Sequence, residues 1–526
     1  VSVAAFLGLA VAHGDTAAPL ILDAFKSADV KWQNAATEAA RAAKGDKTPQ
    51  ALLAQLTSLP QGAQALLIGV FADRGYAAAL PSVTTLAASP DPAVRLAALH
   101  ALGPLGKPSS VSLLAMSAAS ADATEADAAR VSLYTLRGAD VDSAIGYFFP
   151  TSETSVKTQL IRALAARNAA DSDRVLLMAT SDPDESVRAE AFTALGALSK
   201  PDQLPALTDR LVNVQGEKAR AEAETAVVNV AQKITTENTR ASAVLTKLPA
   251  VKSDAKAQAS LLRVLGRIGD DGALPAIRSA ANDSNAEVSE AALRALAGWS
   301  NDAVLPDLQR LAQKGGESER LIAVRGFLHV LTLPSKRSEE QTLQLYETAL
   351  RFAPSPAEKK TALAGLANVH TERVKTVVKP FLNDPQYSAE AQAALGKLAK
   401  TTITASASDN DAEAKLAIDG KVDTRWSSGA PQKPGQWFQL DLGWERSVSK
   451  ITLDSTPSAG DYPRGYEVYV SKDSTDLGKP VAKGNGNGPI TEIRFASKDG
   501  RYIRIVQAGT EAGLWWSIHE IRVDSQ

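Results

Sequence analysis

Apolar residues follow two different patterns along the chain, and the change comes near residue 400. Before it, Ala, Leu and Val recur at helical spacing, and Gly, Pro, Asp or Asn interrupts them at short, regular intervals. This spacing predicts short amphipathic helices separated by turns. Beyond Thr401 apolar and polar residues alternate, most clearly over 436–442, 448–453, 465–470 and 502–506. Alternation predicts strands that bury one face.

The helical part repeats itself with a period of about 31 residues. Leu274-Pro275 recurs one period later as Leu305-Pro306. The segment 91–95, Asp-Pro-Ala-Val-Arg, returns within 182–188 and more loosely in 283–288. Each unit predicts two short helices, with the first Asp of the segment capping the second helix and Pro near its first position. One pair cannot bury its apolar stripe alone, so about twelve stacked pairs would form one continuous core.

The signature of Asp-Pro followed shortly by Val-Arg, together with Leu-Gly pairs near the ends of second helices (102–103, 195–196 and 265–266), resembles HEAT repeats. The resemblance covers roughly residues 1–400. It implies a right-handed α-solenoid of helical hairpins that offers a long surface to a protein partner. The opening residues 1–12, VSVAAFLGLAVA, fit the second helix of a repeat better than the apolar part of a signal peptide. We therefore expect the chain to begin mid-repeat and the native protein to extend further towards its N-terminus.

Ordered motifs in the last quarter resemble the discoidin, or coagulation-factor C-type, module. The motifs are Ala405-Ser406, Ala417-Ile418-Asp419-Gly420, Thr424-Arg425-Trp426, and the segments 437–443, 466–471, 501–504 and 517–521. The resemblance implies that residues 401–526 form a galactose-binding-like β-sandwich jelly roll, a fold common in carbohydrate-binding modules. The expected architecture is therefore a multidomain α plus β chain, with the solenoid over 1–400 and the sandwich after it. Trp426 and Trp516 are expected in its core.

Asp419, Thr424 and Glu520 offer two carboxylates and a hydroxyl from distant parts of this module. Such hard oxygen ligands suit Ca²⁺, which takes about six to eight of them. The resemblance implies that the Asp419 carboxylate, the Thr424 hydroxyl and carbonyl, the Glu520 carboxylate and the carbonyls of Leu416 and Lys421 hold a structural Ca²⁺. The alternative is a metal-free turn in which Asp419 caps backbone amides.

The resemblance also implies a ligand site in loops at one end of the sandwich. The candidates for carbohydrate binding are Asp461, Tyr462, Arg464 and Trp515, because an aromatic platform beside a charged hydrogen-bonding group suits a sugar ring. For Tyr462 and Trp515 the alternative is packing against the domain. Galactose-binding relatives often carry an Arg after Tyr-x-Pro and an Asn-Gly before the next strand. Here the Arg stands at 464 and that Asn is absent, which weakens the expectation of galactose. Some relatives bind lipid through apolar loop tips, for which Trp444 is the candidate.

Composition narrows the possible partners. Lys and Arg total 57 against 59 Asp and Glu, split 42 to 42 up to residue 400 and 15 to 17 beyond it. Neither part is basic, so we expect no nucleic-acid partner. The absence of Cys excludes disulfides, thiolate zinc sites and Cys nucleophiles. No apolar run reaches the length of about 18 residues that a membrane-spanning helix needs.

Motifs for catalysis are missing from the solenoid, which has no phosphate-binding Gly-rich loop, no nucleophile elbow and no His pair at helical spacing. The preferred hypothesis is a non-catalytic bacterial protein, periplasmic, cell-surface or secreted, in which the solenoid binds a protein and the last module binds glycan. One alternative is the C-terminal accessory region of a larger secreted enzyme, a glycoside hydrolase or oxidoreductase, whose catalytic domain lies upstream. Another is a solenoid that acts as a base-excision or lyase enzyme.

Overall fold

The computed structural model describes residues 2–169, 172–236, 239–371, 373–399 and 403–525. The chain divides into two compact units, Val1–Ala295 and Leu296–Gln526. Helices fill the first unit, and the second contains further helices followed by an antiparallel β-sandwich. Within the described ranges, no helix is both long enough and apolar enough to cross a lipid bilayer.

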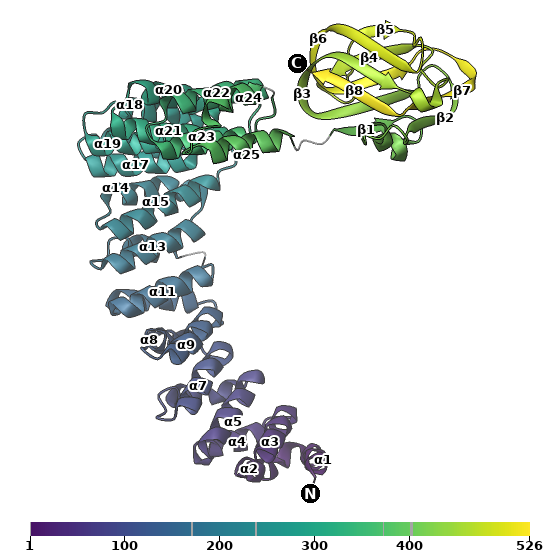
Figure 1. The fold of residues 1–526 in the computed structure, drawn as a ribbon. Helices are drawn as coiled ribbons and strands as arrows, with labels where there is room; N and C mark the ends of the chain where they lie inside the picture. Colours follow the sequence, from purple (N-terminus) through teal and green to yellow (C-terminus); the bar gives the residue numbers. More distant parts are fainter. Residues whose placement is uncertain (1, 170–171, 237–238, 372, 400–402, 526) are drawn as a thin grey trace. The chain divides into compact units, whose positions relative to one another are not determined.

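The first unit is a succession of helical pairs that stack along the chain (Figure 1). Its α-helices, the last of which runs past the division between the units, are α1 (Val3–His13), α2 (Ala18–Phe25), α3 (Val30–Ala42), α4 (Lys47–Gln55), α5 (Gln61–Asp73), α6 (Leu80–Leu86), α7 (Pro92–Leu105), α8 (Val111–Ala118), α9 (Ala123–Thr135), α10 (Val141–Phe148), α11 (Thr154–Ala166), α12 (Asp173–Ala179), α13 (Glu185–Leu198), α14 (Leu204–Asn213), α15 (Glu217–Gln232), α16 (Ser242–Leu245), α17 (Ala255–Ile268), α18 (Leu274–Ala280) and α19 (Ala286–Ala297).

Polar caps begin the second helices, although two of the predicted caps are wrong. Asp91 caps α7 as expected, because its carboxylate accepts two backbone amides at 2.9 and 3.0 Å. In the other two copies the cap is Asp184 or Asn285, each two residues after the expected Asp182 or Asp283. The earlier Asp accepts the amide of the capping residue instead, at 3.0 and 2.8 Å. In every copy the cap is the third residue before the buried Val of the motif. The position of that Val therefore determines where the second helix begins.

The Arg of the repeat signature joins each turn to the following repeat. Arg95 donates to the Ser89 carbonyl and to the Glu125 carboxylate, both at 2.6 Å. Arg188 donates in the same way to carbonyls of its own turn and to the Gln215 carbonyl, the latter at 3.0 and 3.1 Å. Turn carbonyls that would otherwise lack a partner are thereby satisfied. The signature therefore stabilises the stacking of neighbouring repeats.

Small residues allow the second helices to approach closely, as the Leu-Gly pairs predict. A Cβ atom at Gly266 would lie 2.8 Å from the Cα of Ala295, which is closer than atoms can pack. At the start of the chain, Phe6 of α1 packs edge-on against Trp32 of α3, with ring centroids 5.5 Å apart. The segment Val3–His13 therefore packs as a repeat helix.

The second unit continues with short helices and then changes to strands. Its helices are α20 (Leu305–Lys314), α21 (Glu317–Thr332), α22 (Glu339–Phe352), α23 (Pro356–Leu366), α24 (Arg373–Val378) and α25 (Ser388–Ala399). Its strands are β1 (Thr404–Ala407), β2 (Trp426–Gln432), β3 (Trp437–Asp454), β4 (Tyr466–Ser471), β5 (Ala482–Gly484), β6 (Ile490–Gln507), β7 (Glu511–Ile518) and β8 (Glu520–Ser525).

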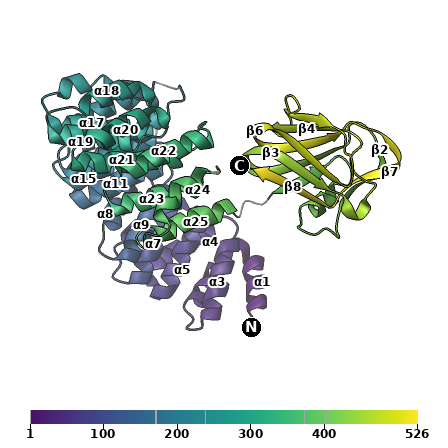
Figure 2. The same cartoon turned by 45° about the horizontal axis from the view of Figure 1, so that its top comes forward.

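The strands form two antiparallel sheets. The larger has the order β1-β3-β6-β4-β5 with β8 also paired to β3, and the smaller pairs β2 with β7. Figure 2 shows β3, β4 and β6 side by side. Two segments predicted as separate strands, 436–442 and 448–453, belong to the single long strand β3. A register shift between Asp441 and Arg446 interrupts the pairing there, where Gly443 adopts a φ of 79°.

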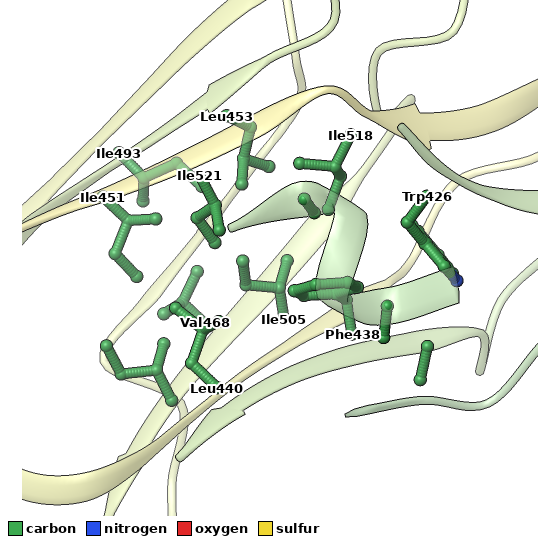
Figure 3. Close-up of a cluster of buried hydrophobic side chains, with 14 of the residues drawn as sticks. Trp426, Phe438, Leu440, Ile451, Leu453, Val468, Ile493, Ile505, Ile518 and Ile521 are labelled. Atoms are coloured by element: carbon green, nitrogen blue, oxygen red, sulfur yellow. The ribbon is translucent and has the colours of Figure 1, made fainter. Parts of the chain in front are cut away.

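Apolar side chains from both sheets meet in the core of the sandwich (Figure 3). Trp426, Phe438 and Trp516 form an aromatic cluster, with centroids 5.0 Å apart for Trp426 and Phe438 and 5.1 Å apart for the two indoles. All three are fully buried. The predicted core position of Trp426 and Trp516 is therefore confirmed. The aromatic cluster packs the smaller sheet against the larger one.

Candidate functional site

Tyr462, Arg464 and Trp515 meet at one end of the sandwich. The loop between η12 (Thr456–Ser458) and β4 carries the first two, and β7 carries the third. One buried amide, that of Gln432, donates to the carbonyl of Tyr462 at 3.1 Å and to that of Trp515 at 2.8 Å. Arg464 reaches the Glu511 carboxylate at the start of β7, with 3.4 Å between Nε and Oε2. The structure therefore brings three of the four predicted binding residues into one surface.

Trp515 presents its indole to solvent. It is 44% exposed, and its neighbour Leu514 is 37% exposed, whereas the adjacent Trp516 is fully buried. Burial along β7 changes from exposed to buried between these two tryptophans, since residues 512–515 are exposed and residues 516–518 are buried. Of the two interpretations of Trp515, the exposed platform is the one that this geometry supports.

Arg464 is held firmly over Tyr462. Its guanidinium carbon lies 4.0 Å from the centroid of the phenol ring, and its N–H groups donate to the carbonyls of Tyr462 and Gly460 at 3.2 and 3.0 Å. A guanidinium has five N–H groups, so two remain for a ligand. The stacked Arg464 covers one face of the Tyr462 ring, which makes Trp515 rather than Tyr462 the open aromatic face. A hydrogen bond from the Gly513 amide and the charge of Arg464 hold the pKa of Glu511 below its usual value.

Asp461, the fourth predicted binding residue, points inward. Its carboxylate accepts the Ser517 hydroxyl at 2.6 Å and lies 3.5 Å from the Arg425 guanidinium. Only 14% of its side chain is exposed. Asp461 is thus engaged in joining its loop to β7, and it supports the surface from beneath.

Sequence reasoning missed Glu511, Gln432 and Gln507, which bond to the candidate binding residues or to the loop that carries them. Gln432 and Gln507 are 1% and 0% exposed. The available signal was weak: Gln432 ends a strand before the Pro434-Gly435 turn, where a polar residue normally faces water. Only the packing of strands distant in sequence buries it.

The predicted metal residues also come together. The Asp419 carboxylate accepts the Thr424 hydroxyl at 2.8 Å and the Lys421 amide at 2.9 Å. The same hydroxyl lies 3.1 Å from the Lys421 carbonyl. Glu520, at the start of β8, accepts the Gly420 amide at 3.2 Å. The turn therefore caps its own amides, as the metal-free alternative expects, and it brings the Thr424 hydroxyl close to both the Asp419 carboxylate and the Lys421 carbonyl.

The surroundings of Glu520 disfavour its charged form. Burial raises the pKa of Glu520, the Asp419 charge adds to the rise, and the hydrogen bond from Gly420 opposes it. Leu416 lies in the 3₁₀ segment η11 (Asp411–Ala417), just before the turn. No group of three or more His, Cys, Asp or Glu side chains able to hold a metal occurs in the described ranges, so a cation here would depend on carbonyl and hydroxyl oxygens as well.

Trp444, the candidate for a lipid-binding loop tip, is in fact buried. It is 4% exposed, and the Arg446 guanidinium stacks on it at 4.6 Å from the ring centroid. An indole covered in this way cannot insert into a membrane.

Comparison with known proteins confirms both resemblances. Residues 402–521 match the F5/8 type C domain, and residues 49–133, 149–227 and 242–326 match HEAT repeats. The chain therefore carries HEAT repeats followed by an F5/8 type C, or discoidin, domain. A galactose oxidase of Gibberella zeae is 33% identical over 134 residues, which cover 23% of this chain and 19% of that enzyme. The chain thus matches only about a fifth of that curated relative.

Solved structures of similar sequence match the same share of the chain. The family 32 CBM from C. perfringens NanJ in complex with galactose is 28% identical and covers 23% of this chain and 92% of that one, with a TM-score of 0.21. The CBM32 of AlyQ in complex with 4,5-unsaturated mannuronic acid is also 28% identical, with coverages of 23% and 93% and a TM-score of 0.20.

Proposed function

We propose that this protein is a non-catalytic binding protein whose F5/8 type C domain recognises carbohydrate through Trp515, Arg464 and Tyr462. The observation that supports it best is the exposed indole of Trp515 beside a guanidinium that keeps free N–H groups. The C–H face of a sugar ring packs against an aromatic face, while its hydroxyls need fixed donors and acceptors nearby. Arg464 supplies donors there, and Glu511 supplies acceptor oxygens.

The charges of this surface favour a neutral sugar. Arg464 is paired with Glu511, and Asp461 lies beside Arg425. Each charge is therefore offset by a neighbour of opposite sign, so the surface offers no uncompensated cation to a uronic acid and no uncompensated anion to an amino sugar. Hydroxyl groups can still bond to the remaining N–H groups of Arg464, because charge-assisted hydrogen bonds do not need a charged ligand.

A glycan array tests this function directly. The full chain would be applied to neutral, acidic and amino-sugar glycans from plants, algae and mucin. We expect signal on neutral glycans that Trp515→Ala removes. Tyr147→Ala is the matched control, since Tyr147 is 89% exposed on the solenoid and remote in sequence from the domain. Silence of the wild-type chain on all classes would exclude the carbohydrate function.

We further propose that Ca²⁺ binds between Asp419 and Glu520 and stabilises the domain. The donors that fit are the two carboxylates, the Thr424 hydroxyl and carbonyl, and the Lys421 and Leu416 carbonyls, all hard oxygens of the kind Ca²⁺ prefers. The raised pKa of Glu520 supports the fit, because a divalent cation would relieve the repulsion from Asp419. When bound, the ion would supply positive charge that ties the turn 419–424 to β8.

Thermal unfolding with and without a chelator tests the calcium site. We expect Ca²⁺ to raise the melting temperature of the wild-type domain and to leave Asp419→Asn unchanged. Asp473→Asn is the control, because Asp473 also caps a turn, through the amides of Thr475 and Asp476, but does so within its own loop after β4. Equal melting temperatures in calcium and chelator would refute the site.

For the solenoid we propose a protein partner. HEAT pairs present a long continuous surface, and here Met116, Tyr147 and Met178 occupy equivalent repeat positions on α8, α10 and α12. They are 57%, 89% and 47% exposed, and Tyr147 and Met178 line the same hollow. Exposed apolar side chains that recur at one repeat position are a common feature of binding surfaces. A partner that binds wild type should be lost when all three become Ser, and retained if these residues play no part.

A second candidate function is favoured by one comparison. The similarity to galactose oxidase extends over about a fifth of that enzyme. This is consistent with an accessory role in a larger secreted enzyme, an oxidoreductase or a glycoside hydrolase. Mass spectrometry of the native protein distinguishes the two: a mass near 55.2 kDa favours the binding protein, and a much larger mass favours the enzyme. Both candidates place the protein in the periplasm, on the cell surface or outside the cell, where polysaccharides occur.

A further inference from the structure

Gln432 lies directly beneath the proposed recognition surface. It ends β2, where it pairs with Glu511 at the start of β7, and it is 1% exposed. A buried primary amide must find partners for two N–H groups and for two acceptor sites on its oxygen. The identity of those partners decides what the residue does.

All four bonding positions of the Gln432 amide are used. Its nitrogen donates to the Tyr462 carbonyl at 3.1 Å and to the Trp515 carbonyl at 2.8 Å. Its oxygen accepts the Arg464 amide at 3.0 Å and the Gln507 side-chain nitrogen at 2.6 Å. Three of the four partners are backbone groups of the three recognition residues. A single buried side chain therefore bonds to the backbone of all three.

Gln507 extends this support into the larger sheet. It is fully buried at the end of β6, and its oxygen accepts the amides of Gly465 and Gly509, each at 3.1 Å. The two glycines touch, since a Cβ atom at Gly465 would lie 2.7 Å from the Gly509 nitrogen. The recognition loop is thus connected through two bonded side-chain amides to the strand that forms the centre of the sheet.

We propose that Gln432 is a positioning residue: its amide sets the spacing between the Trp515 indole and the Arg464–Tyr462 pair, and so determines which sugar shape the surface accepts. This inference rests on the proposed carbohydrate function. Residues 462–464 and 515 belong to segments far apart in sequence, and at the surface the long contact between Arg464 and Glu511 links them. A geometry held by four hydrogen bonds to one buried amide is far better defined than one held by a single long, partly exposed ion pair.

The test compares two buried glutamines in the full-length chain. Gln432→Met keeps a side chain of similar length but removes the bonds to the Arg464 amide and the Trp515 carbonyl, and it leaves Arg464 as the donor to the Tyr462 carbonyl. Gln439→Met is the matched control, because Gln439 is 8% exposed and its oxygen accepts Arg504 on the outer face of the larger sheet. A purely structural role would make the two variants behave alike.

Three readouts separate positioning from stability. Hydrogen exchange of peptides covering 460–466 and 511–517 reports the Arg464 amide and β7 directly. The fluorescence lost in Trp515→Phe identifies the emission of Trp515, and quenching of that emission by iodide reports how exposed the indole is. Affinity electrophoresis in galactomannan, alginate and gastric mucin reports binding. For Gln432→Met we expect exchange in both peptides to rise about tenfold and binding to weaken about tenfold, with altered quenching, while Gln439→Met changes none of the three.

Gln432→Glu tests the direction of the bonds. A carboxylate still accepts from Arg464 and Gln507 but cannot donate to the Tyr462 and Trp515 carbonyls. Exchange should therefore rise mainly in the peptide 511–517. If Gln432→Met keeps wild-type exchange and quenching, Gln432 does not position the surface. If the wild-type chain binds none of the three polysaccharides, the proposed function fails for them, and the exchange data still decide the role of Gln432.

Discussion

Replacing Trp515 with Ala should weaken carbohydrate binding about tenfold. A fully exposed indole presents roughly 250 Å², so the observed 44% leaves about 110 Å² for a ligand to cover. A sugar ring covers one face, about half of that area, which at about 25 cal/mol per Å² corresponds to about 1.4 kcal/mol, or a factor of ten in Kd. Because the ring already faces water, the folded domain should lose little stability.

Isothermal titration of the full chain with the best glycan from the array would measure this loss. Trp515→Phe should keep part of the affinity, because a smaller aromatic face remains. Tyr147→Ala should bind as wild type does. If Trp515→Ala binds within about twofold of wild type while Arg464→Ala abolishes binding, the sugar does not use the indole, and the platform argument is wrong.

Four further predictions concern stability. In calcium-free buffer the raised pKa of Glu520 means that its charge destabilises the folded domain. The melting temperature should therefore fall as pH rises from the ordinary Glu pKa of about 4.3 through the raised pKa of the folded state. Glu520→Gln should remove that fall, and a melting temperature of the wild type that does not depend on pH would contradict the argument. Phe438→Ala should lower the free energy of unfolding of the sandwich, measured in urea, by about 3 to 5 kcal/mol, because it removes one ring from the aromatic cluster and leaves a cavity. A loss below about 1 kcal/mol would show that the cluster repacks. Asp91→Ala should cost about 1 kcal/mol by removing the cap of α7, measured by the helical circular dichroism transition, with Asp182→Ala costing less because Asp182 caps no helix. Gly326→Ala should destabilise the helices after α20, since a Cβ atom there would lie 2.4 Å from the Cα of Ala297, and unchanged unfolding would mean that α21 can shift away.

The fold could be predicted from the sequence to the extent that it depends on periodicity. A regular repeat with Leu-Pro and Val-Arg at fixed places predicts stacked helical pairs, and alternation predicts the sandwich; both family matches confirm these interpretations. Trp426 and Trp516 were correctly placed in the core. Element boundaries were less predictable. The caps at Asp184 and Asn285 follow from the position of the buried Val three residues later. The Asp residues that the repeat pattern indicated, Asp182 and Asp283, lie two residues before those caps.

The candidate site was predictable only where chemistry is local. Asp419, Lys421 and Thr424 lie within one turn, and the structure brings them together as the spacing suggests. Trp515 also stands out as one of two adjacent tryptophans, although it was predicted in a loop and lies in strand β7. The inward turn of Asp461 and the burial of Gln432 depend on strands that are distant in sequence. No pattern of neighbouring residues can indicate the direction of such polar side chains, because distant backbone groups supply their partners.

The segment that begins β2 connects the core, the recognition loop and the metal turn. Trp426 is in the aromatic core, the preceding Arg425 donates to Ser458 of the recognition loop, and Thr424 bonds to Asp419. His519 completes the connection, with Nδ1 at 2.9 Å from the Val422 carbonyl and Nε2 at 3.0 Å from the Ser458 hydroxyl. A carbonyl only accepts hydrogen bonds, so Nδ1 carries the hydrogen; Ser458 then donates to Nε2 and accepts from Arg425. Every polar group in this chain of contacts therefore has a partner of the correct kind. If the turn 419–424 moves, it must either move Ser458 with it or break one of these hydrogen bonds. The turn and the recognition loop should therefore respond together when either is altered.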